Sequence, residues 1–127
     1  MILLDTHVAL WLVAAPDRIG ARSRHAMERS EVCYFSAISL AECAIKRMIG
    51  RLDVPADLAR VLTESGLRAL ALLPEHAEAI EKFPELARHD PFDRLLLGQA
   101  LVERCRFLTA DRRLLALDKA WIIPADE

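Results

Sequence analysis

The sequence predicts an α/β fold in which helices cover both faces of a mostly parallel sheet of five strands. Short apolar segments typical of strands alternate along the chain with longer segments typical of helices. The opening segment MILLD, residues 1–5, is apolar up to its final aspartate, as expected for a parallel strand that is buried on both faces. Parallel neighbours also need crossover connections, which the intervening helical segments supply.

The composition indicates one folded domain. The chain has 127 residues, enough for a single domain over residues 1–127 but not for two. Hydrophobic residues make up 54% and charged residues 28%, which excludes a disordered chain. The formal net charge of -2 gives no global attraction to nucleic acid or to anionic lipid. Any phosphate-bearing partner therefore has to be held by a local arrangement of charges.

No segment predicts export or a membrane span. The longest apolar run, Val8–Pro16, is far shorter than the ~20 residues that a membrane-spanning helix needs. Asp5 and His7 precede this run, and no basic segment opens the chain as it would in a secretion signal. We therefore expect a cytoplasmic protein without membrane contact.

The first half of the chain predicts two strands and three helices. In chain order these are a strand at 1–5, helices at about 6–14 and 21–29, a strand at 32–36 and a helix at about 39–49. Thr6 and Ser39 are the predicted N-caps, because a hydroxyl oxygen can accept a hydrogen bond from a free backbone N–H of the first turn. The helix VALWLVAA, which follows Thr6, is apolar nearly all round, so it is either covered on more than one side or lies in a subunit interface.

The second half continues the alternation. We expect helices at about 55–65, 74–83 and 91–104, strands at 67–73, 106–109 and 120–123, and a short helix from 111. Pro55, Pro74 and Pro91 stand at helix starts, where their missing N–H costs nothing. Gly50 and Gly66 stand at helix ends.

Four acids fall at corresponding places in this pattern. Asp5 ends the first strand, and Asp111 follows the fourth. Glu42 is about one turn into the helix after the second strand, and Asp93 is in the first turn of the helix that leads to the fourth. Ligands of an open parallel sheet bind beyond the carboxyl ends of its strands. If the first strand lies between the second and the fourth, all four carboxylates converge on that edge.

Taken one at a time, three of these acids also have ordinary structural explanations. Ser39 and Glu42 fit a capping box. Asp93 lies in the first turn of its helix, where the helix dipole favours an acid, and Asp111 could cap the last helix. Asp5 has no such explanation if Thr6 is the cap, and a carboxylate at the end of a buried strand is costly unless it is paired or binds a cation. Two unit charges about 4 Å apart repel by about 4 kcal/mol at an effective dielectric of 20. The cluster therefore predicts a divalent cation, and its all-oxygen ligands suit Mg²⁺ or Mn²⁺.

Four segments resemble those of a known family. They are LLDTHVALW at 3–11, SAISLAECAIK at 36–46, HDPFDRLLLGQAL at 89–101 and FLTADRRL at 107–114. Each holds one of the four acids, and together they extend over essentially the whole chain. The chain resembles the PIN-domain ribonucleases and, within them, the VapC-type toxins of bacterial toxin–antitoxin pairs.

The resemblance implies a three-layer α/β/α sandwich and a Mg²⁺- or Mn²⁺-dependent endoribonuclease that hydrolyses tRNA, rRNA or mRNA. Its catalytic and metal-binding residues would be Asp5, Glu42, Asp93 and Asp111. A homodimer is also implied, as is a small VapB-type antitoxin whose tail blocks the active site. The implied supporting residues are Thr6, His7, Ser36, Thr109 and Asp90, of which Asp90 is expected to cap its helix. The chain reads Arg88-His89 where family members often have His and then Arg, which leaves the roles of both residues open.

The acids also predict the chemistry. A bound ion would activate water for in-line attack on phosphorus, so no Lys, His or Ser nucleophile is required. The histidines at 25, 76 and 89 do not have the spacing of a zinc site. The basic residues near the acids are candidates for RNA phosphate contacts: Lys46, Arg94, Arg112 and Arg113. Solvated faces and ion pairs, such as Glu42 with Lys46 four residues later, explain each of them equally well.

Aromatic residues make up only 6% of the chain, too few for a base-stacking platform, so recognition should depend on RNA shape. Two other functions fit the acids less well. An aspartyl phosphotransferase would need either a second acid two residues after Asp5 or a paired Lys, and the sequence Asp-Thr-His at 5–7 fits neither well. A catalytically idle interaction module would be expected to have lost some of the four acids.

Overall fold

The structure is a computed structural model that describes all residues, 1–127, and contains one sheet of five strands. The strands are β1 (Ile2–Leu4), β2 (Cys33–Ser36), β3 (Arg68–Leu70), β4 (Arg106–Thr109) and β5 (Ile122–Pro124). Their order is β3-β2-β1-β4-β5, and every neighbouring pair is parallel. The predicted central place of the first strand between the second and the fourth is confirmed. The sheet is wholly parallel, where the sequence predicted a mostly parallel one.

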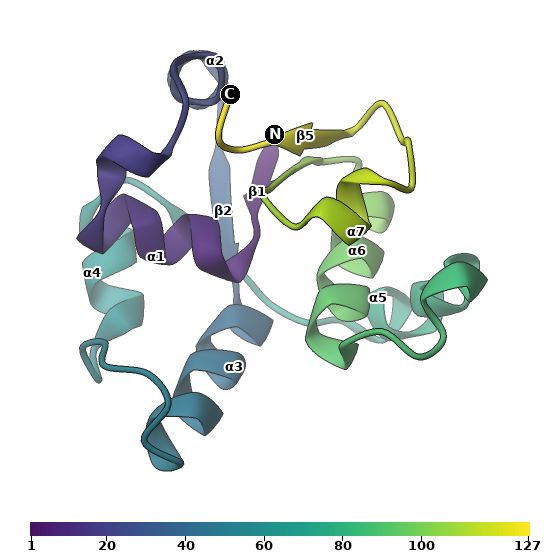
Figure 1. Ribbon diagram of the computed structural model, residues 1–127, viewed down its shortest axis with the longest axis horizontal. Coiled ribbons are helices and arrows are strands. Elements are labelled where there is room, and N and C mark those ends of the chain that lie inside the picture. The colour runs from purple at the N-terminus through teal and green to yellow at the C-terminus, as the bar shows by residue number, and fades with distance from the viewer.

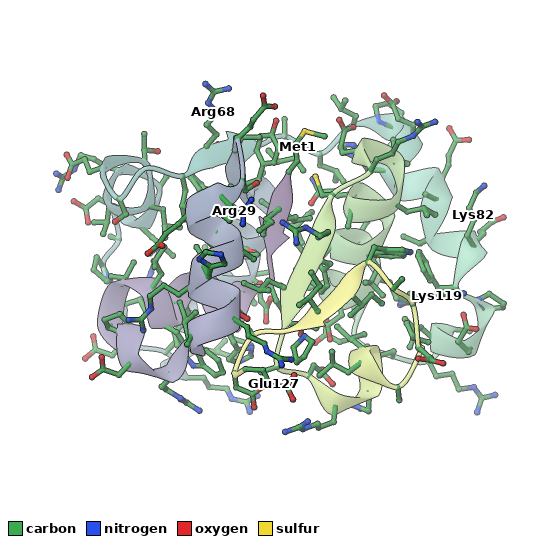
Figure 2. The ribbon with its side chains drawn as sticks, turned by 90° about the horizontal axis from the view of Figure 1, so that it is seen from above. Met1, Arg29, Arg68, Lys82, Lys119 and Glu127 are labelled. Atoms are coloured by element: carbon green, nitrogen blue, oxygen red, sulfur yellow. The ribbon has the colours of Figure 1, made fainter.

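Helices cover both faces of this sheet, which makes the predicted three-layer sandwich (Figure 1). They are α1 (Thr6–Ala14), α2 (Ala21–Arg29), α3 (Ala37–Met48), α4 (Leu58–Glu64), α5 (Pro74–Glu78), α6 (Pro91–Glu103) and α7 (Arg112–Leu115). Helices α1, α2 and α4 pack on one face, and α6 and α7 pack on the other, with α5 against α6. Helix α3 extends beyond the carboxyl end of β2, as Figure 1 shows. The view from above in Figure 2 shows the sheet between the two helical layers.

The side chains of the central strands alternate between two hydrophobic cores. In β1, Ile2 and Leu4 lie in the core under α1, α2 and α4, whereas Leu3 lies in the core under α6 and α7. In β4, Phe107 and Leu108 divide between the two cores in the same way. All five side chains are fully buried. This burial on both faces is why the opening strand is apolar at successive positions rather than at alternate ones.

Two predicted helix caps are wrong. The N-cap of α1 is Asp5, whose carboxylate accepts a hydrogen bond from the backbone N–H of Thr6. The N-cap of α3 is Ser36, whose hydroxyl accepts from the backbone N–H of Ile38, so α3 begins directly at the end of β2. Ser39 lies inside α3, and its hydroxyl hydrogen-bonds the Thr6 hydroxyl at 2.8 Å. Both helices therefore start earlier in the sequence than the predicted caps implied.

Other boundaries differ by a few residues. The predicted strand at 67–73 is reduced to Arg68–Leu70, and the predicted helix at 74–83 divides into α5 and a 3-10 helix at Ala79–Lys82. Helix α4 begins three residues after Pro55, and β5 begins at Ile122 rather than at 120. The strand at Arg106–Thr109 and the caps of α6 and α7 by Asp90 and Asp111 are confirmed.

None of the helices has the length and apolar character that crossing a bilayer would require.

Candidate active site

The four acids named from the sequence lie beyond the carboxyl ends of the three central strands. Asp5 directly follows β1, and Asp111 follows β4 by two residues. Glu42 lies in the second turn of α3, which continues directly from β2, and Asp93 lies in the first turn of α6. Because all strands are parallel, these positions share one edge of the sheet.

Asp5 is buried, with 4% of its surface exposed. Its Oδ1 accepts from the backbone N–H of Thr6 at 2.8 Å, and its Oδ2 accepts from the Thr109 hydroxyl at 2.6 Å. The expectation that Asp5 has no capping role is therefore wrong. Burial raises the pKa of the Asp5 carboxyl above its ordinary value, and the negative charge of Glu42 adds to the shift, whereas the two hydrogen bonds oppose it.

Glu42 is buried in α3, and only 5% of its side chain is exposed. Its Oε2 accepts from Lys46 Nζ at 2.7 Å, the ion pair that the spacing of four residues suggested. Its Oε1 is buried and has no hydrogen-bond partner. The capping-box explanation fails, because Ser36 caps the helix and Ser39 bonds to Thr6. A buried carboxylate oxygen without a partner is costly, so Oε1 is an atom that a cation or a hydrogen-bond donor would stabilise.

Asp93 and Asp111 meet at His89. The ring Nε2 of His89 lies 2.8 Å from Asp93 Oδ2 and 3.9 Å from Asp111 Oδ2. One ligand atom from each of the three residues lies within 4.8 Å of the other two. The sequence alone left the role of His89 open. Its spacing of four residues from Asp93 was the signal, but His89 precedes the N-cap of α6, so helical periodicity did not apply to it.

The charge of Asp93 is opposed by its surroundings. Burial is the main cause that raises the pKa of Asp93, to about 6, and the negative charges of Asp5 and Asp90 add to it, while His89 works in the opposite direction. Asp5 is thus electrostatically coupled both to Glu42 and to Asp93. Since Asp93 also lies near Asp111, charge interactions connect all four acids, and the tightest grouping of ligand atoms is that of His89, Asp93 and Asp111.

The supporting residues differ in what they contact. Thr109 donates to Asp5 and accepts from the backbone N–H of Asp111 at 3.0 Å, so it fixes two of the acids relative to each other. The hydroxyl of Ser36 bonds to Gln99 rather than to an acid. Asp90 caps α6 through the backbone N–H of Phe92, as expected, and is exposed. His7 is exposed and lines a shallow pocket of about 220 Å³ with Asp5, Trp11, Ala110 and Asp111.

The basic residues near the cluster also differ in accessibility. Lys46 is held by Glu42. One guanidinium nitrogen of Arg94 donates to the carbonyl of Ala87 at 3.3 Å, and its Nε is buried without a partner. Arg112 and Arg113 are largely exposed, with Arg113 Nε 3.9 Å from Asp111. A hollow of about 600 Å³ adjoins the cluster, lined by Glu85, Leu86, Arg88, His89, Arg113, Ala116 and Leu117.

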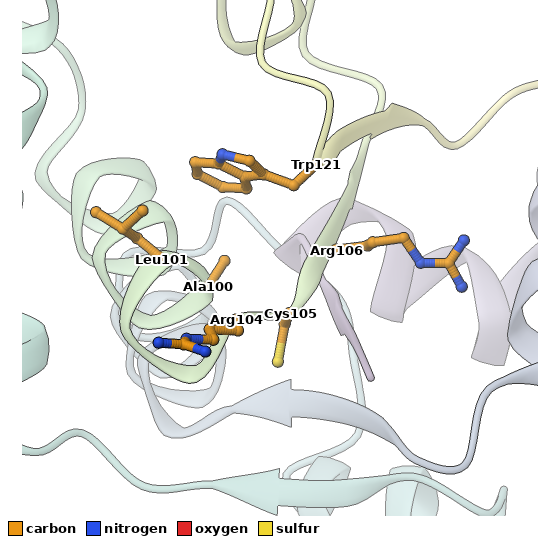
Figure 3. Close-up of a pocket in the computed structure, with 6 residues that line it drawn as sticks. All are labelled: Ala100, Leu101, Arg104, Cys105, Arg106 and Trp121. Carbon is orange, nitrogen blue, oxygen red and sulfur yellow. The ribbon is translucent and has the colours of Figure 1, made fainter.

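A third pocket lies at the opposite edge of the sheet (Figure 3). It is a space of about 250 Å³ between the end of α6 and the start of β4, where the Trp121 ring faces Leu101 and Ala100. The Arg106 side chain extends away from the indole. No acid lines this pocket, so the candidate chemistry belongs to the carboxyl edge.

The acid cluster fits a hard divalent cation. Its donors are carboxylate oxygens, which Mg²⁺ and Mn²⁺ prefer, and it contains more negative charge than its two basic neighbours, Lys46 and His89, can balance. The unpartnered Oε1 of Glu42 is the atom that such an ion would satisfy.

The chain is similar to known proteins over nearly its whole length. The family profile for the PIN domain matches residues 2–120. The chain is 30% identical over 115 residues to Ribonuclease VapC22 of Mycobacterium tuberculosis (strain ATCC 25618 / H37Rv), with 89% of this chain and 88% of that protein covered.

Solved structures show the same fold. A toxin–antitoxin complex from Klebsiella pneumoniae gives a TM-score of 0.68 at 17% identity, covering 100% of this chain and 99% of that one. VapBC2 from Rickettsia felis, bound to a promoter DNA fragment, gives a TM-score of 0.67 at 14% identity. This match covers 98% of this chain and 97% of that one. FitAcB from Neisseria gonorrhoeae gives a TM-score of 0.57 at 24% identity, covering 94% of this chain and 95% of that one. Fold, sequence and profile agree, and the chain belongs to the PIN-domain family.

Proposed function

We propose that the chain is a Mg²⁺- or Mn²⁺-dependent endoribonuclease and the toxin of a toxin–antitoxin pair. The observation that carries the proposal is the buried, unpartnered Oε1 of Glu42 within a cluster of four acids. The similarity to Ribonuclease VapC22, and the fold shared with toxin–antitoxin complexes, support the substrate class and the biological role.

The metal would be held by Asp5, Glu42, Asp93 and Asp111. A divalent ion in such a site activates water and offsets the charge that develops on a phosphodiester during hydrolysis. Thr109 keeps Asp5 and Asp111 together, and Lys46 neutralises one oxygen of Glu42 while it leaves the other free. These contacts hold the acids in place before substrate arrives, which is how a preorganised site lowers a barrier.

The chain's own hydroxyl groups are poor candidates for a nucleophile. Thr6 and Ser39 bond to each other, Ser36 bonds to Gln99, and Thr109 donates to Asp5. All four are buried, and each is engaged in a hydrogen bond. This arrangement supports direct hydrolysis by water rather than a covalent intermediate.

The RNA backbone is proposed to approach along the hollow beside His89. Arg88 and Arg113 line it, and both are exposed and able to contact phosphate. Arg112, on the same turn as Arg113, is a further candidate. Lys46 and Arg94, which the sequence also suggested, are already held within the protein, so their phosphate contacts would require exchange of partners.

The proposed antitoxin would cover both the site and the end of α3. Ile45, Met48 and Ile49 are the exposed apolar residues there, with Met48 85% exposed. They follow Glu42 by one to two turns of the same helix, so one bound peptide could reach the acids and bury these side chains together.

A homodimer is proposed as well, through the apolar helix α1.

The proposed activity is tested by incubating total RNA with the purified chain in Mn²⁺, in Mg²⁺ or in EDTA, and sequencing the RNA ends. We expect specific cleavage with metal and none in EDTA. Glu42→Gln should lower the cleavage rate by at least about 100-fold, because it removes one of the anionic ligands on which the metal site depends.

The matched control is Asp90→Asn, because asparagine caps a helix as well as aspartate does. This variant should cleave at close to the wild-type rate. Cleavage in EDTA, or a wild-type rate for Glu42→Gln, would contradict the proposal. Absence of cleavage on every RNA would favour an idle interaction module.

A further inference from the structure

We infer that His89 supplies a nitrogen ligand to the divalent ion, beside the carboxylates of Asp93 and Asp111. The inference rests on the proposed function in that the acids must bind an ion. It goes further in adding a neutral nitrogen donor to a site otherwise made of oxygen atoms.

The geometry places one His89 nitrogen between two of the acids. The ring Nε2 is 2.8 Å from Asp93 Oδ2 and 3.9 Å from Asp111 Oδ2. Donors bound to one six-coordinate ion at bonds of about 2.1 Å are separated by about 3 Å when adjacent and about 4 Å when opposite. The observed separations are close to these values, so a small adjustment of side chains would let all three donors bind one ion.

The ring is also held in place. Only 6% of the His89 side chain is exposed, in contrast to the exposed His7 on the Asp5 side of the site. The ring is largely covered and already hydrogen-bonds Asp93, so it lies beside any cation that binds that acid. An ion bound to Asp93 and Asp111 would therefore lie beside Nε2, which can bind it in the tautomer that carries the ring proton on Nδ1. The buried, unpartnered Oε1 of Glu42, which interacts electrostatically with Asp5, is an independent observation that favours a cation at these acids.

The alternative is that His89 only balances the charge of the metal-free site. In that case the ring would be displaced by the ion, and its removal would leave metal affinity unchanged or would increase it. A ligand role predicts the reverse. It also predicts selectivity, because an imidazole nitrogen favours transition-metal ions such as Mn²⁺ and Co²⁺ over Mg²⁺.

Pulsed electron paramagnetic resonance of the full chain loaded with Mn²⁺ tests this directly. We expect a ¹⁴N coupling from a histidine nitrogen. When histidine is labelled with ¹⁵N, a ¹⁵N coupling should replace it. The coupling should disappear in His89→Gln and persist in the matched control His7→Gln. Thermal melting in EDTA verifies that both variants are folded.

Titration calorimetry supplies a second readout. Since loss of even an outer partner of a metal ligand typically costs 10- to 100-fold in affinity, His89→Gln should weaken Mn²⁺ binding by about tenfold or more. Its Mg²⁺ affinity should fall by less.

Three results would overturn the inference: no nitrogen coupling in the wild-type protein, a coupling that disappears in His7→Gln instead, or a Mn²⁺ affinity that His89→Gln leaves unchanged or raises. The first two do not require His89→Gln to fold. A wild-type chain that binds neither ion would instead refute the proposed function on which the inference rests.

Discussion

The fold of the metal-free protein disfavours the charged form of Asp93. Burial and the charge of Asp5 raise its pKa from 3.8 to about 6. Between about pH 4 and pH 6 the folded state therefore keeps a proton that the unfolded chain has lost. The metal-free protein should lose stability as the pH rises through this window, and the loss should be complete above the folded pKa.

Asp93→Asn should remove this part of the pH dependence. We expect the variant to match the wild type near pH 4 and to exceed its free energy of unfolding at pH 7 by on the order of 2 kcal/mol. Urea unfolding in EDTA at several pH values measures the difference, with Asp53→Asn as the control, because Asp53 is exposed and is not among the groups that shift the pKa of Asp93. If the free energies of unfolding of Asp93→Asn and the wild type change with pH in parallel, the fold does not disfavour the charged form of Asp93.

Single residues were only partly predictable. The four acids could be named because each stands at a fixed place relative to a strand end. The cap role of Asp5 could not, because Asp5 and Thr6 both fit an N-cap and only the course of the backbone after β1 decides between them. His89 was missed because its approach to Asp93 depends on the turn before α6, for which the sequence has no periodic signal.

At the scale of elements, α3 shows how two good local patterns can compete. Ser36 and Ser39 both precede helical residues, and Ser39 with Glu42 even completes a capping box. The sheet decides between them, because β2 ends at Ser36 in register with Leu70 of β3. A helix that starts there places Glu42 in its second turn and frees its carboxylate from capping.

Helix α1 is expected to lie in a homodimer interface. Leu10, Trp11, Leu12 and Val13 are only partly buried in the single chain, although the helix is apolar nearly all round. Sedimentation at micromolar concentration should therefore give a dimer. Ala14→Glu, at the exposed end of α1, should produce monomers because it places a charge in an apolar interface.

The control for this prediction is Met48→Glu, which changes the exposed end of α3 and should leave the dimer intact. A wild-type monomer would refute the dimer. If only Met48→Glu produces monomers, the dimer interface lies at α3 rather than at α1.

At the scale of the whole molecule, the wholly parallel sheet is what gathers the site. The order β3-β2-β1-β4-β5 sets the ends of β1, β2 and β4 side by side, so acids that are far apart in the chain become neighbours. This much followed from the sequence, because alternating strands and helices leave few other topologies. The short edge strands β3 and β5 were less well predicted, since edge strands lack a partner on one side and their apolar pattern is weaker.

Close packing between layers was not predictable at all. A Cβ on Gly98 of α6 would lie 2.5 Å from the carbonyl oxygen of His76 in α5, so the two helices approach to backbone contact. Nothing in the local sequence distinguishes this glycine from one that ends a helix. Contacts of this kind depend on where distant segments meet.

Calorimetric titration of the metal-free chain with Mg²⁺ and Mn²⁺, together with thermal melting, tests the account most directly. Because ligand binding to the folded state adds stability, about 2.7 kcal/mol at 100 times Kd, the Tm of the wild type should rise with metal. Glu42→Gln should lose most of the binding heat and most of the rise in Tm. A wild-type chain that shows neither binding heat nor a change in Tm would contradict the claim that these four acids meet to bind a divalent ion.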